Sequence, residues 1–465
     1  MDAASPPPTA PLPGSLAQQI RTARTQHGQS PADLAGPEFS PAYIAALEQG
    51  AVPPSPPVLA YLAARLDLPL ATLQALPCPL TTPVDLLALA EDLRYQANCA
   101  LRLIRAGQPA AGLELVAAAE GYAGPYLAAL PASWRYRLPF LRGRAYYQQA
   151  AFAQAEAALT AALALAESDP DALVQTANLL GALLAQREHP ERALAQHLRC
   201  LHLVQTTPIA DLNLRFSVYR NLATDYLALH DLPHAIAIYQ QALALLADLD
   251  DPERRAAILW GLLLACRESG DTVQAKLYGL QALRIYEARN RPAEAAAVCL
   301  NLAEICLDEA RSDEAERLLK QAKWWLRDTP DAGLGSYLYG DWAMLALQAG
   351  DLAHATAYAA QSLELAATHR SQPAAEAPAA SAYPTRTYAE ALQVAALVAE
   401  ARGEARAADA LFAQALEVIG QTGFDEAAQT MRWRYAQLLA ARGAVAEAVA
   451  YYQVLAGFRP RSRQG

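Results

Sequence analysis

Residues 223–242 read ATDYLALHDLPHAIAIYQQA, and this stretch carries the pattern that decides the fold. The positions of the pattern are counted from Ala235. A small residue, Ala223, lies twelve positions before it, the bulky Tyr239 lies four positions after it, and the small Ala242 lies seven after it. Small residues at helical spacing let two helices approach closely, while the bulky residue fills the space beside them. The stretch therefore predicts a pair of closely packed helices.

The same alanine recurs through most of the chain at nearly constant spacing. The steps between successive alanines are 38, 42, 40, 40, 40, 53 and 40 residues. The series comprises Ala155, Ala193, Ala235, Ala275, Ala315, Ala355, Ala408 and Ala448. A fixed period of this size is typical of a helical solenoid, in which hairpins stack and bury a continuous core. The sequence therefore predicts an all-α fold of a kind that binds other molecules and seldom catalyses reactions.

Composition narrows the class of protein. The 465 residues are 54% hydrophobic and only 18% charged, which suits densely packed helices. No apolar run is long enough to span a membrane, and the first residues lack the basic and apolar parts of a secretory signal. The six cysteines form no C-x-x-C pair, so we interpret them as buried thiols in a reducing cytoplasm. The net charge of −10 opposes general binding to nucleic acids or anionic membranes, so any DNA contact must be local.

Prolines divide the chain into parts. In order, these are a disordered proline-rich tail at 1–14, a small helical head at 15–76, a linker at 77–84, a repeat array at 85–458 and a short basic tail at 459–465. The 53-residue step is explained by a polar, proline-containing insertion near residues 370–386. This insertion predicts a mobile loop within one repeat.

Three helix starts in the head share one device, a serine followed by a proline. Ser30-Pro31, Ser40-Pro41 and Ser55-Pro56 each put a hydroxyl that can accept a backbone N–H before a proline, which has no N–H to leave unpaired. Together with helices expected at 16–27 and 70–76, they predict five short helices in the head.

One segment of the head, SPAYIAALEQG at residues 40–50, fits the pattern S-x-x-Y-I-x-x-[IL]-E-x-G. With its flanking helices it resembles the XRE-type, Cro/repressor-like helix-turn-helix domain. The resemblance implies that residues 41–49 are a recognition helix in the major groove of DNA, with Ile44 and Leu47 in the core. It also implies a DNA-contacting set made of outward-pointing residues of this helix, its capping serine and arginines that reach phosphates. That set is Arg21, Arg24, Ser40, Ala42, Tyr43, Ala46 and Gln49.

Several residues of the head depart from the family pattern. Pro31 stands where the family commonly has a phosphate-contacting glutamine, and the turn before Ser40 is one residue short. The base-reading positions offer no paired hydrogen bonds to a base, and the head holds three arginines against four acidic residues. Glu48 is expected to pair with an arginine of the first helix rather than to contact DNA. DNA binding therefore competes with an alternative in which the head keeps this fold but no longer binds DNA.

The repeats resemble tetratricopeptide repeats in a longer, roughly 40-residue form, over about residues 93–458. The resemblance implies a right-handed α-solenoid of about nine hairpins, the first of them a weaker unit with Gly112 in place of the alanine. In such solenoids the first helix of each hairpin lines a concave face. Asparagines there often bridge the backbone of a bound peptide, and arginines can take its carboxylates. The predicted peptide groove comprises Arg144, Asn178, Arg220, Asn221, Trp260 and Asn301. The alternative is that each of these residues only solvates an inner helix.

No catalytic constellation stands out in the sequence. The motifs G-x-x-x-x-G-K-[ST], H-E-x-x-H and G-x-S-x-G are absent, and no G-x-G-x-x-G follows a strand. The eight histidines are scattered, and no cysteine or carboxylate spacing completes a metal site around them. We therefore expect no enzymatic activity, no metal ion and no cofactor.

The combination of such a head with a repeat array resembles the RRNPP peptide-sensing regulators of bacteria. It implies a cytoplasmic, sequence-specific transcriptional regulator that binds a palindromic operator in double-stranded DNA and senses a peptide or protein ligand. The array is expected to form a homodimer, for which the last hairpin offers Tyr451, Tyr452, Val454 and Phe458. The alternative is a protein-interaction scaffold whose head does not bind DNA. No membrane contact is expected.

Overall fold

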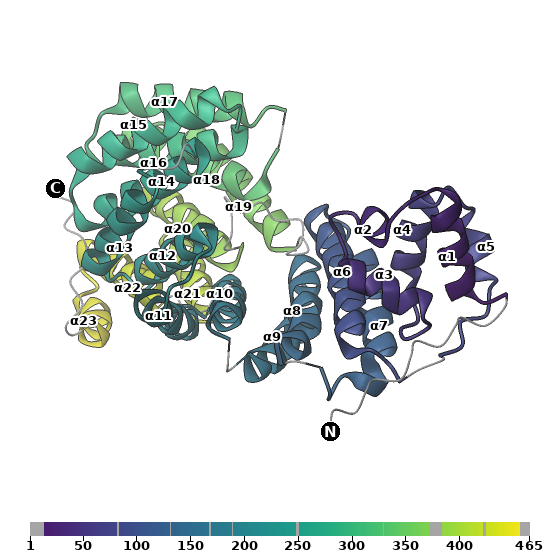
Figure 1. Ribbon diagram of the computed structural model, residues 1–465. Helices are drawn as coiled ribbons and strands as arrows, with labels where there is room; N and C mark the ends of the chain where they lie inside the picture. The colour runs from purple at the N-terminus through teal and green to yellow at the C-terminus, as the bar shows by residue number, and fades with distance from the viewer. Residues whose placement is uncertain are drawn as a thin grey trace. The chain divides into compact units, whose positions relative to one another are not determined.

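The computed structural model describes residues 14–80, 83–130, 132–166, 169–187, 189–247, 251–328, 330–371, 384–421 and 425–455. Within these ranges the chain forms 23 α-helices and one short 3-10 helix and no β-strand, which confirms the predicted all-α fold (Figure 1). Apart from Gly14, the predicted tails lie outside these ranges, as do most of the predicted inserted loop and Phe458. Contacts between residues divide the chain into two compact units, unit 1 at residues 1–179 and unit 2 at 180–465. None of the described helices is long and apolar enough to cross a membrane.

Unit 1 begins with five short helices at the predicted places. They are α1 (Leu16–Gln26), α2 (Pro31–Ala35), α3 (Pro41–Glu48), α4 (Pro56–Arg65) and α5 (Leu70–Gln74). Ser30 and Ser40 cap α2 and α3 as expected, because the hydroxyl of each accepts a backbone N–H from the first turn of its helix. The starts of α2 and α3 are therefore set by local chemistry that the sequence displays.

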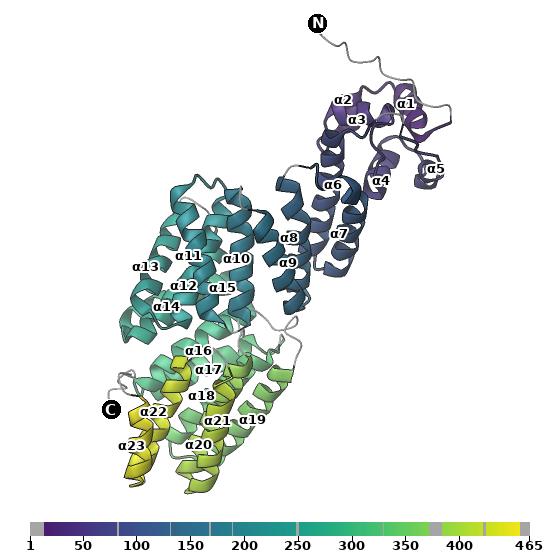
Figure 2. The ribbon, with the colours of Figure 1, turned by 90° about the horizontal axis from the view of Figure 1, so that it is seen from below.

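The remaining helices of unit 1 form two hairpins. The first pairs α6 (Leu86–Arg105) with α7 (Pro109–Ala123), and the second pairs α8 (Ala132–Gln148) with α9 (Phe152–Leu165). A 3-10 turn, Gly124–Tyr126, follows α7, and α10 (Pro170–Gln186) begins in this unit and ends in unit 2. The helices α6 to α9 lie side by side, and the head gathers at one end of α6 (Figure 2).

Ser55, at the start of α4, does not behave as predicted. Its hydroxyl is buried and makes no capping hydrogen bond. Its backbone N–H instead donates to Asp92 of α6 at 2.9 Å. The start of α4 is therefore fixed by a tertiary contact, which the local serine–proline pattern could not reveal.

Unit 2 continues the series of hairpins. Its helices are α11 (Pro190–Thr206), α12 (Leu212–Ala228), α13 (Leu232–Leu245), α14 (Pro252–Ser269), α15 (Thr272–Ala288), α16 (Pro292–Asp308), α17 (Ser312–Trp325), α18 (Ala332–Gln348), α19 (Leu352–Ser371), α20 (Pro384–Ala401), α21 (Ala405–Ile419), α22 (Asp425–Ala441) and α23 (Val445–Val454). The first helices α12, α14, α16, α18 and α20 pack in turn against one another, and second helices such as α15 and α17 lie outside them (Figure 1). Over the described residues, α6 to α23 make nine hairpins, as predicted.

The repeating alanines lie in the core, as their spacing predicted. Each is on the second helix of its hairpin, and all are 0% exposed except Ala448, which is 2% exposed. The small residue twelve positions earlier makes room for the bulky one four positions later. A Cβ atom added to Gly143 would lie 2.7 Å from Leu159 Cγ, and one added to Gly181 would lie 2.5 Å from His197 Nε2. These positions therefore set how closely the two helices of a hairpin approach.

In the hairpins whose turns are described, the turn contains a residue with left-handed backbone, five positions before the buried alanine or, in the first hairpin, before Gly112. At these positions φ lies between 53° and 87° wherever the residue is described. They are Gly107, Ala150, His230, Gly270, Ala310, Gly350, Gly403 and Gly443. Glycine adopts this conformation freely, whereas a Cβ atom makes it costly. Three hairpins therefore fold through a strained turn residue, a feature that the alanine pattern alone did not reveal.

Candidate functional site

Fewer residues of α3 are exposed than the sequence predicted. Ala42 and Gln49 are exposed, as expected for residues that contact a partner. Tyr43 is only 1% exposed and Ala46 only 5%, so the prediction that they point outward is wrong. Two features cause this: α6 packs against α3, and at the end of α3 the chain turns back so that the Ala51 N–H donates to the Ala46 carbonyl at 2.9 Å.

A cluster of hydrogen bonds fixes Tyr43. Its hydroxyl donates to Asp92 Oδ2 at 2.8 Å, and Gln96 donates to the other oxygen of that carboxyl group at 2.8 Å. The tyrosine ring stacks on Phe39, with 4.6 Å between the ring centroids. Burial raises the pKa of Tyr43 and also that of Asp92. The cluster therefore belongs to the core between the head and α6, and not to a DNA-contacting surface.

Ser40, the N-cap of α3, is also engaged by α6. Its backbone N–H and its hydroxyl donate to the two carboxylate oxygens of Glu91, at 2.8 and 2.6 Å. A carboxylate is favourable at a helix N-terminus because the helix dipole and the unpaired N–H groups there attract negative charge. The start of α3, where a helix can receive a phosphate group, is thus occupied by a side chain of the same protein.

Of the two arginines predicted to reach DNA phosphates, one is buried. Arg24 Nε and Nη2 donate to the Glu48 carboxylate at 2.5 and 2.9 Å, and its Nη1 donates to the Gln29 carbonyl at 2.7 Å. The hydrogen bond with Glu48 raises the pKa of Arg24. The expected pairing of Glu48 is confirmed, and it withdraws Arg24 from any DNA contact. The predicted residues that remain exposed are Arg21, Ala42 and Gln49.

The six predicted groove residues are divided between the units. In unit 1, Arg144 on α8 is half-buried, and burial lowers its pKa, while Asn178 on α10 is 8% exposed. In unit 2, the exposed Arg220 donates from Nη2 to the side-chain oxygen of its neighbour Asn221 at 3.1 Å on α12. The remaining two, Trp260 and Asn301, lie on α14 and α16.

Asn301 is part of a polar network on the first helices of unit 2. Its Nδ2 donates to the Ala297 carbonyl at 2.7 Å, and its Oδ1 accepts from Arg267 of α14 at 3.3 Å. Arg267 also forms an ion pair with Glu304 of α16. Trp260 rests edge-on against Tyr286, with 6.4 Å between ring centroids. The predicted Asn301 is therefore linked to a charged side chain that the sequence pattern did not single out.

Asp341 on α18 extends this network and was not predicted. It lies fourteen positions before Ala355, the same place that Asn221 and Asn301 hold before their alanines, so the repeat register could have identified it. It is 8% exposed, and its Oδ2 is buried without a hydrogen-bond partner among the described residues. Burial raises the pKa of Asp341 to about 8, although Arg267 acts in the opposite direction.

A further pair on α20 completes the charged part of the network. Arg386 Nε donates to Glu390 at 2.9 Å, and the charge of Glu390 raises the pKa of Arg386. Tyr337 of α18 and Thr387 of α20 share a hydrogen bond of 3.1 Å between their hydroxyls. The ordered side chains of α14, α16, α18 and α20 thus bring charged, amide and hydroxyl groups together on one set of helices.

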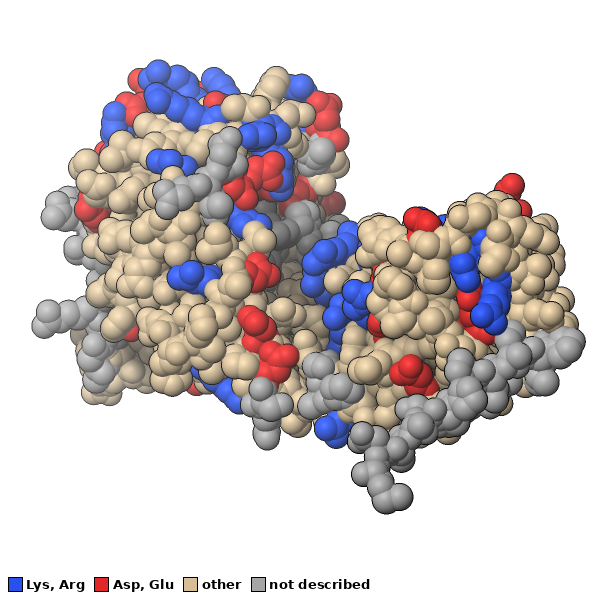
Figure 3. Space-filling model, viewed as in Figure 1, with Lys and Arg blue, Asp and Glu red and all other residues tan. Residues whose placement is uncertain are grey.

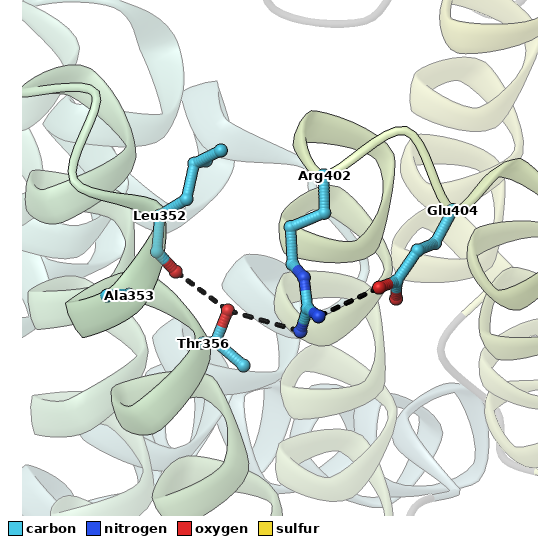
Figure 4. Close-up of a pocket in the computed structure, with 5 residues that line it drawn as sticks. All are labelled: Leu352, Ala353, Thr356, Arg402 and Glu404. Atoms are coloured by element: carbon cyan, nitrogen blue, oxygen red, sulfur yellow. Dashed lines mark hydrogen bonds and ion pairs between the residues drawn. The ribbon is translucent and has the colours of Figure 1, made fainter.

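A shallow depression of about 530 Å³ lies elsewhere in unit 2, at the starts of α19 and α21 (Figure 4). Arg402 Nη2 lies 2.8 Å from Glu404 Oε1, and its Nη1 approaches Thr356 Oγ1 at 3.5 Å. The threonine hydroxyl donates in turn to the Leu352 carbonyl at 2.7 Å. Because these polar groups already have partners, the depression offers little to a ligand. No group of three His, Cys, Asp or Glu residues in the described part of the chain is arranged to hold a metal ion.

Comparison with known proteins identifies the repeat type. A tetratricopeptide-repeat family model matches residues 214–288, which run from α12 to α15. The apo form of the quorum sensor NprR from B. thuringiensis is 14% identical, with a TM-score of 0.55 over 79% of this chain and 99% of that chain. Aspartyl phosphate phosphatase F from Bacillus subtilis is 11% identical, with a TM-score of 0.51 over 80% of this chain and 95% of that chain. No curated protein sequence matches the chain. These likenesses show the fold, and the chain has a tetratricopeptide-type helical fold.

Proposed function

We propose that this chain is a sensor that binds a peptide segment on the first helices of unit 2 and catalyses no reaction itself. The observation that carries the proposal is a pair of buried polar atoms, Trp260 Nε1 on α14 and Asp341 Oδ2 on α18. Neither has a hydrogen-bond partner among the described residues. Buried polar groups in native proteins nearly always have partners, so these two point to groups that arrive with a ligand.

A peptide backbone suits both atoms. It supplies carbonyl groups that accept from the Trp260 indole N–H and N–H groups that donate to the Asp341 carboxyl group. Asn301 lies beside this site, with its amide hydrogen-bonded to Arg267 and to the α16 backbone, and Arg267 is a charged residue that acts on Asp341. The similar fold of NprR, a quorum sensor, supports the further suggestion that the bound peptide is a signal.

Selection from a random phage-displayed peptide library against the full chain tests this proposal. We expect enriched peptides whose affinity, measured by fluorescence anisotropy, falls about tenfold in Trp260→Phe and in Asp341→Ala, because each change removes one hydrogen bond of about 1.4 kcal/mol. Lys320→Ala, at an exposed position of α17, is the matched control and should keep full affinity. Peptides that bind both variants as tightly as the unchanged protein would contradict the proposal.

A second candidate function is sequence-specific DNA binding by a homodimer, with the peptide regulating transcription. The observation that favours it is the exposure of Ala42 and Gln49 within the S-x-x-Y-I-x-x-L-E-x-G pattern, together with that of Arg21 on α1. Alanine can contact a thymine methyl group, and glutamine can pair with adenine in the major groove. The competing reading is a scaffold whose head serves only to bind α6.

Enrichment of fragmented genomic DNA at about 50 and 200 mM salt, followed by sequencing, separates these two readings, since phosphate contacts weaken as salt rises. DNA binding by a homodimer predicts a palindromic motif that is lost in Gln49→Ala and weakened in Arg21→Ala. Pro41→Ala, at the exposed start of α3, is the control. It changes the same helix but leaves the Gln49 side chain in place, so it should keep the motif. Absence of any motif, with and without the selected peptide, leaves the scaffold as the function.

A further inference from the structure

Four arginines gather on one face of two neighbouring helices in unit 1. Arg94 and Arg105 lie eleven residues apart on α6, and Arg137 and Arg144 lie seven residues apart on α8. Both intervals are close to whole numbers of helical turns, so each pair shares one side of its helix. The helices α6 and α8 pack against each other, and Figure 3 shows a group of Lys and Arg side chains over them.

These four residues, which we call the arginine face, have no carboxylate partner within the described part of the chain. Arg94 donates to the Glu38 backbone carbonyl, and Arg137 donates from Nη2 to Asn98 Oδ1 at 2.8 Å. The guanidinium groups of Arg105 and Arg144 make no hydrogen bond to the described residues. Both helices also carry arginines that do meet an acid: Arg102 of α6 lies 3.8 Å from Glu38, and Arg142 of α8 is paired with Glu120.

The arginine face forms two subsites, each made by one residue from each helix. Arg94 lies near enough to Arg137 to lower its pKa, and Arg105 does the same to Arg144. Burial lowers the pKa of Arg137 and Arg144 more strongly still. Half-buried like charges without a counter-ion are unfavourable, and in a chain of net charge −10 acidic residues are not scarce. A bound ligand would therefore supply the negative charge that balances these arginines.

We infer that the arginine face binds an acidic peptide segment, with one carboxylate in each subsite. A guanidinium group matches a carboxylate in shape and can hold it through two parallel hydrogen bonds. The side chain of Trp134, 5.4 Å from the guanidinium carbon of Arg137, adds an aromatic surface beside the first subsite. A rigid DNA duplex suits this face less well, because three of the four arginines are half-buried between helices.

The helix geometry sets the spacing of the two carboxylates. At a rise of about 1.5 Å per residue, the two subsites are roughly 10 to 16 Å apart along the helices. An extended peptide covers about 3.3 to 3.6 Å per residue, so its two acidic residues should be about three to five positions apart. This inference extends the proposed peptide-binding function to unit 1, which would hold a second peptide site with the stated charge and spacing, separate from the one proposed in unit 2.

Labelled octapeptides, rich in glycine and serine, test the inference by fluorescence anisotropy with the full chain. One carries two aspartates four positions apart, one carries adjacent aspartates, and one carries asparagines instead. We expect the spaced acidic peptide to bind at least tenfold more tightly than the asparagine peptide and more tightly than the adjacent one. The double variant Arg137→Gln/Arg144→Gln should lose this preference. Arg135→Gln, at an exposed position of α8, should keep it.

Three outcomes would overturn the inference. The first is equal binding of acidic and asparagine peptides by the unchanged protein. The second is a double variant that retains the acidic preference while its melting temperature falls, as a purely structural role would require. The third is a 20-base-pair DNA duplex that binds the arginine face and is released by the double variant while the acidic peptide does not bind. If any of these outcomes occurs while library peptides still depend on Trp260 and Asp341, this inference is rejected and the proposed function stands.

Discussion

The hydroxyl of Tyr43 on α3 donates a 2.8 Å hydrogen bond to Asp92 on α6, and both side chains are buried. This bond joins the helix that resembles a recognition helix to the first helix of the repeats. Beside it, Ser40 at the start of α3 holds Glu91, the residue preceding Asp92. The head is thus tied to α6 by two adjacent carboxyl groups.

Tyr43→Phe is expected to destabilise unit 1 by about 1–3 kcal/mol, because a buried carboxyl group loses one of its hydrogen bonds. Urea unfolding followed by circular dichroism measures the change. Tyr452→Phe, on the partly exposed end of α23, should have little effect. If Tyr43→Phe left the stability unchanged but abolished DNA binding, Tyr43 would be a contact residue after all.

Arg24→Ala should destabilise the head by about 3–5 kcal/mol, since it leaves the buried Glu48 carboxylate without its partner. Arg21→Ala, at an exposed side chain 4.0 Å from the same carboxylate, should change the stability far less. Thermal unfolding of both variants gives the comparison. Equal losses of stability in the two variants would mean that both arginines pair with Glu48 to the same extent.

Gly143→Ala should cost about 1–3 kcal/mol, because its Cβ atom would lie 2.7 Å from Leu159 Cγ and force the two helices of the hairpin apart. Gly121 in α7 has no atom within 4 Å of such a Cβ atom, so Gly121→Ala should be neutral or slightly stabilising. Chemical denaturation of the two variants tests whether the small residue is required for packing. A neutral Gly143→Ala would show that the hairpin can adjust.

Ala310→Gly is expected to stabilise unit 2 by roughly 1 kcal/mol. Ala310 holds a φ of 57° at the turn between α16 and α17, where five other hairpins have glycine. Ala349→Gly, at a position with φ of −80°, should instead be destabilising by a smaller amount, because glycine there only adds freedom to the unfolded chain. Opposite shifts of the melting temperature are the expected result, and shifts of the same sign would refute the strain argument.

Asp341→Asn should change how stability depends on pH. Burial raises the pKa of Asp341 from 3.8 in its unperturbed form to about 8 in the folded chain. The folded state therefore keeps a proton that the unfolded chain releases, so stability from this group falls as the pH rises from about 4 to about 8. At this position the asparagine variant has no group that loses a proton in this range. Its melting temperature minus that of the unchanged protein should therefore be larger at pH 8 than at pH 5. A parallel shift at both pH values would contradict this reading.

The repeat architecture could be predicted because it rests on spacing that local physics enforces. The alanines from Ala155 to Ala448 are buried because only a small side chain fits where two helices cross, and that requirement appears once in each hairpin. The serine–proline pairs at Ser30 and Ser40 cap their helices within one turn, so their neighbours in sequence suffice to predict them. Glu48 pairs with Arg24, as its place in the head pattern suggested.

The candidate sites depended instead on contacts between residues far apart in sequence. Tyr43 and Ala46 point outward on a helical wheel, yet α6 and the returning chain bury them, and Asp92 lies 49 residues from Tyr43. Asp341 shares the repeat register of Asn221 and Asn301, but only the packing around α18 decides that its oxygen is buried without a partner among the described residues.

The sequence by itself determined the helices, their pairing and the spacing of the hairpins, because hydrophobic periodicity and capping act within a few turns. Only the tertiary structure decided which polar residues are exposed, which are paired and which face one another. Burial of a charged or hydrogen-bonding group depends on the whole set of helices around it, as the arginine face on α6 and α8 illustrates. Acids stand near it on the same helices, but Glu91 and Asp92 already bind Ser40, Tyr43 and Ser55.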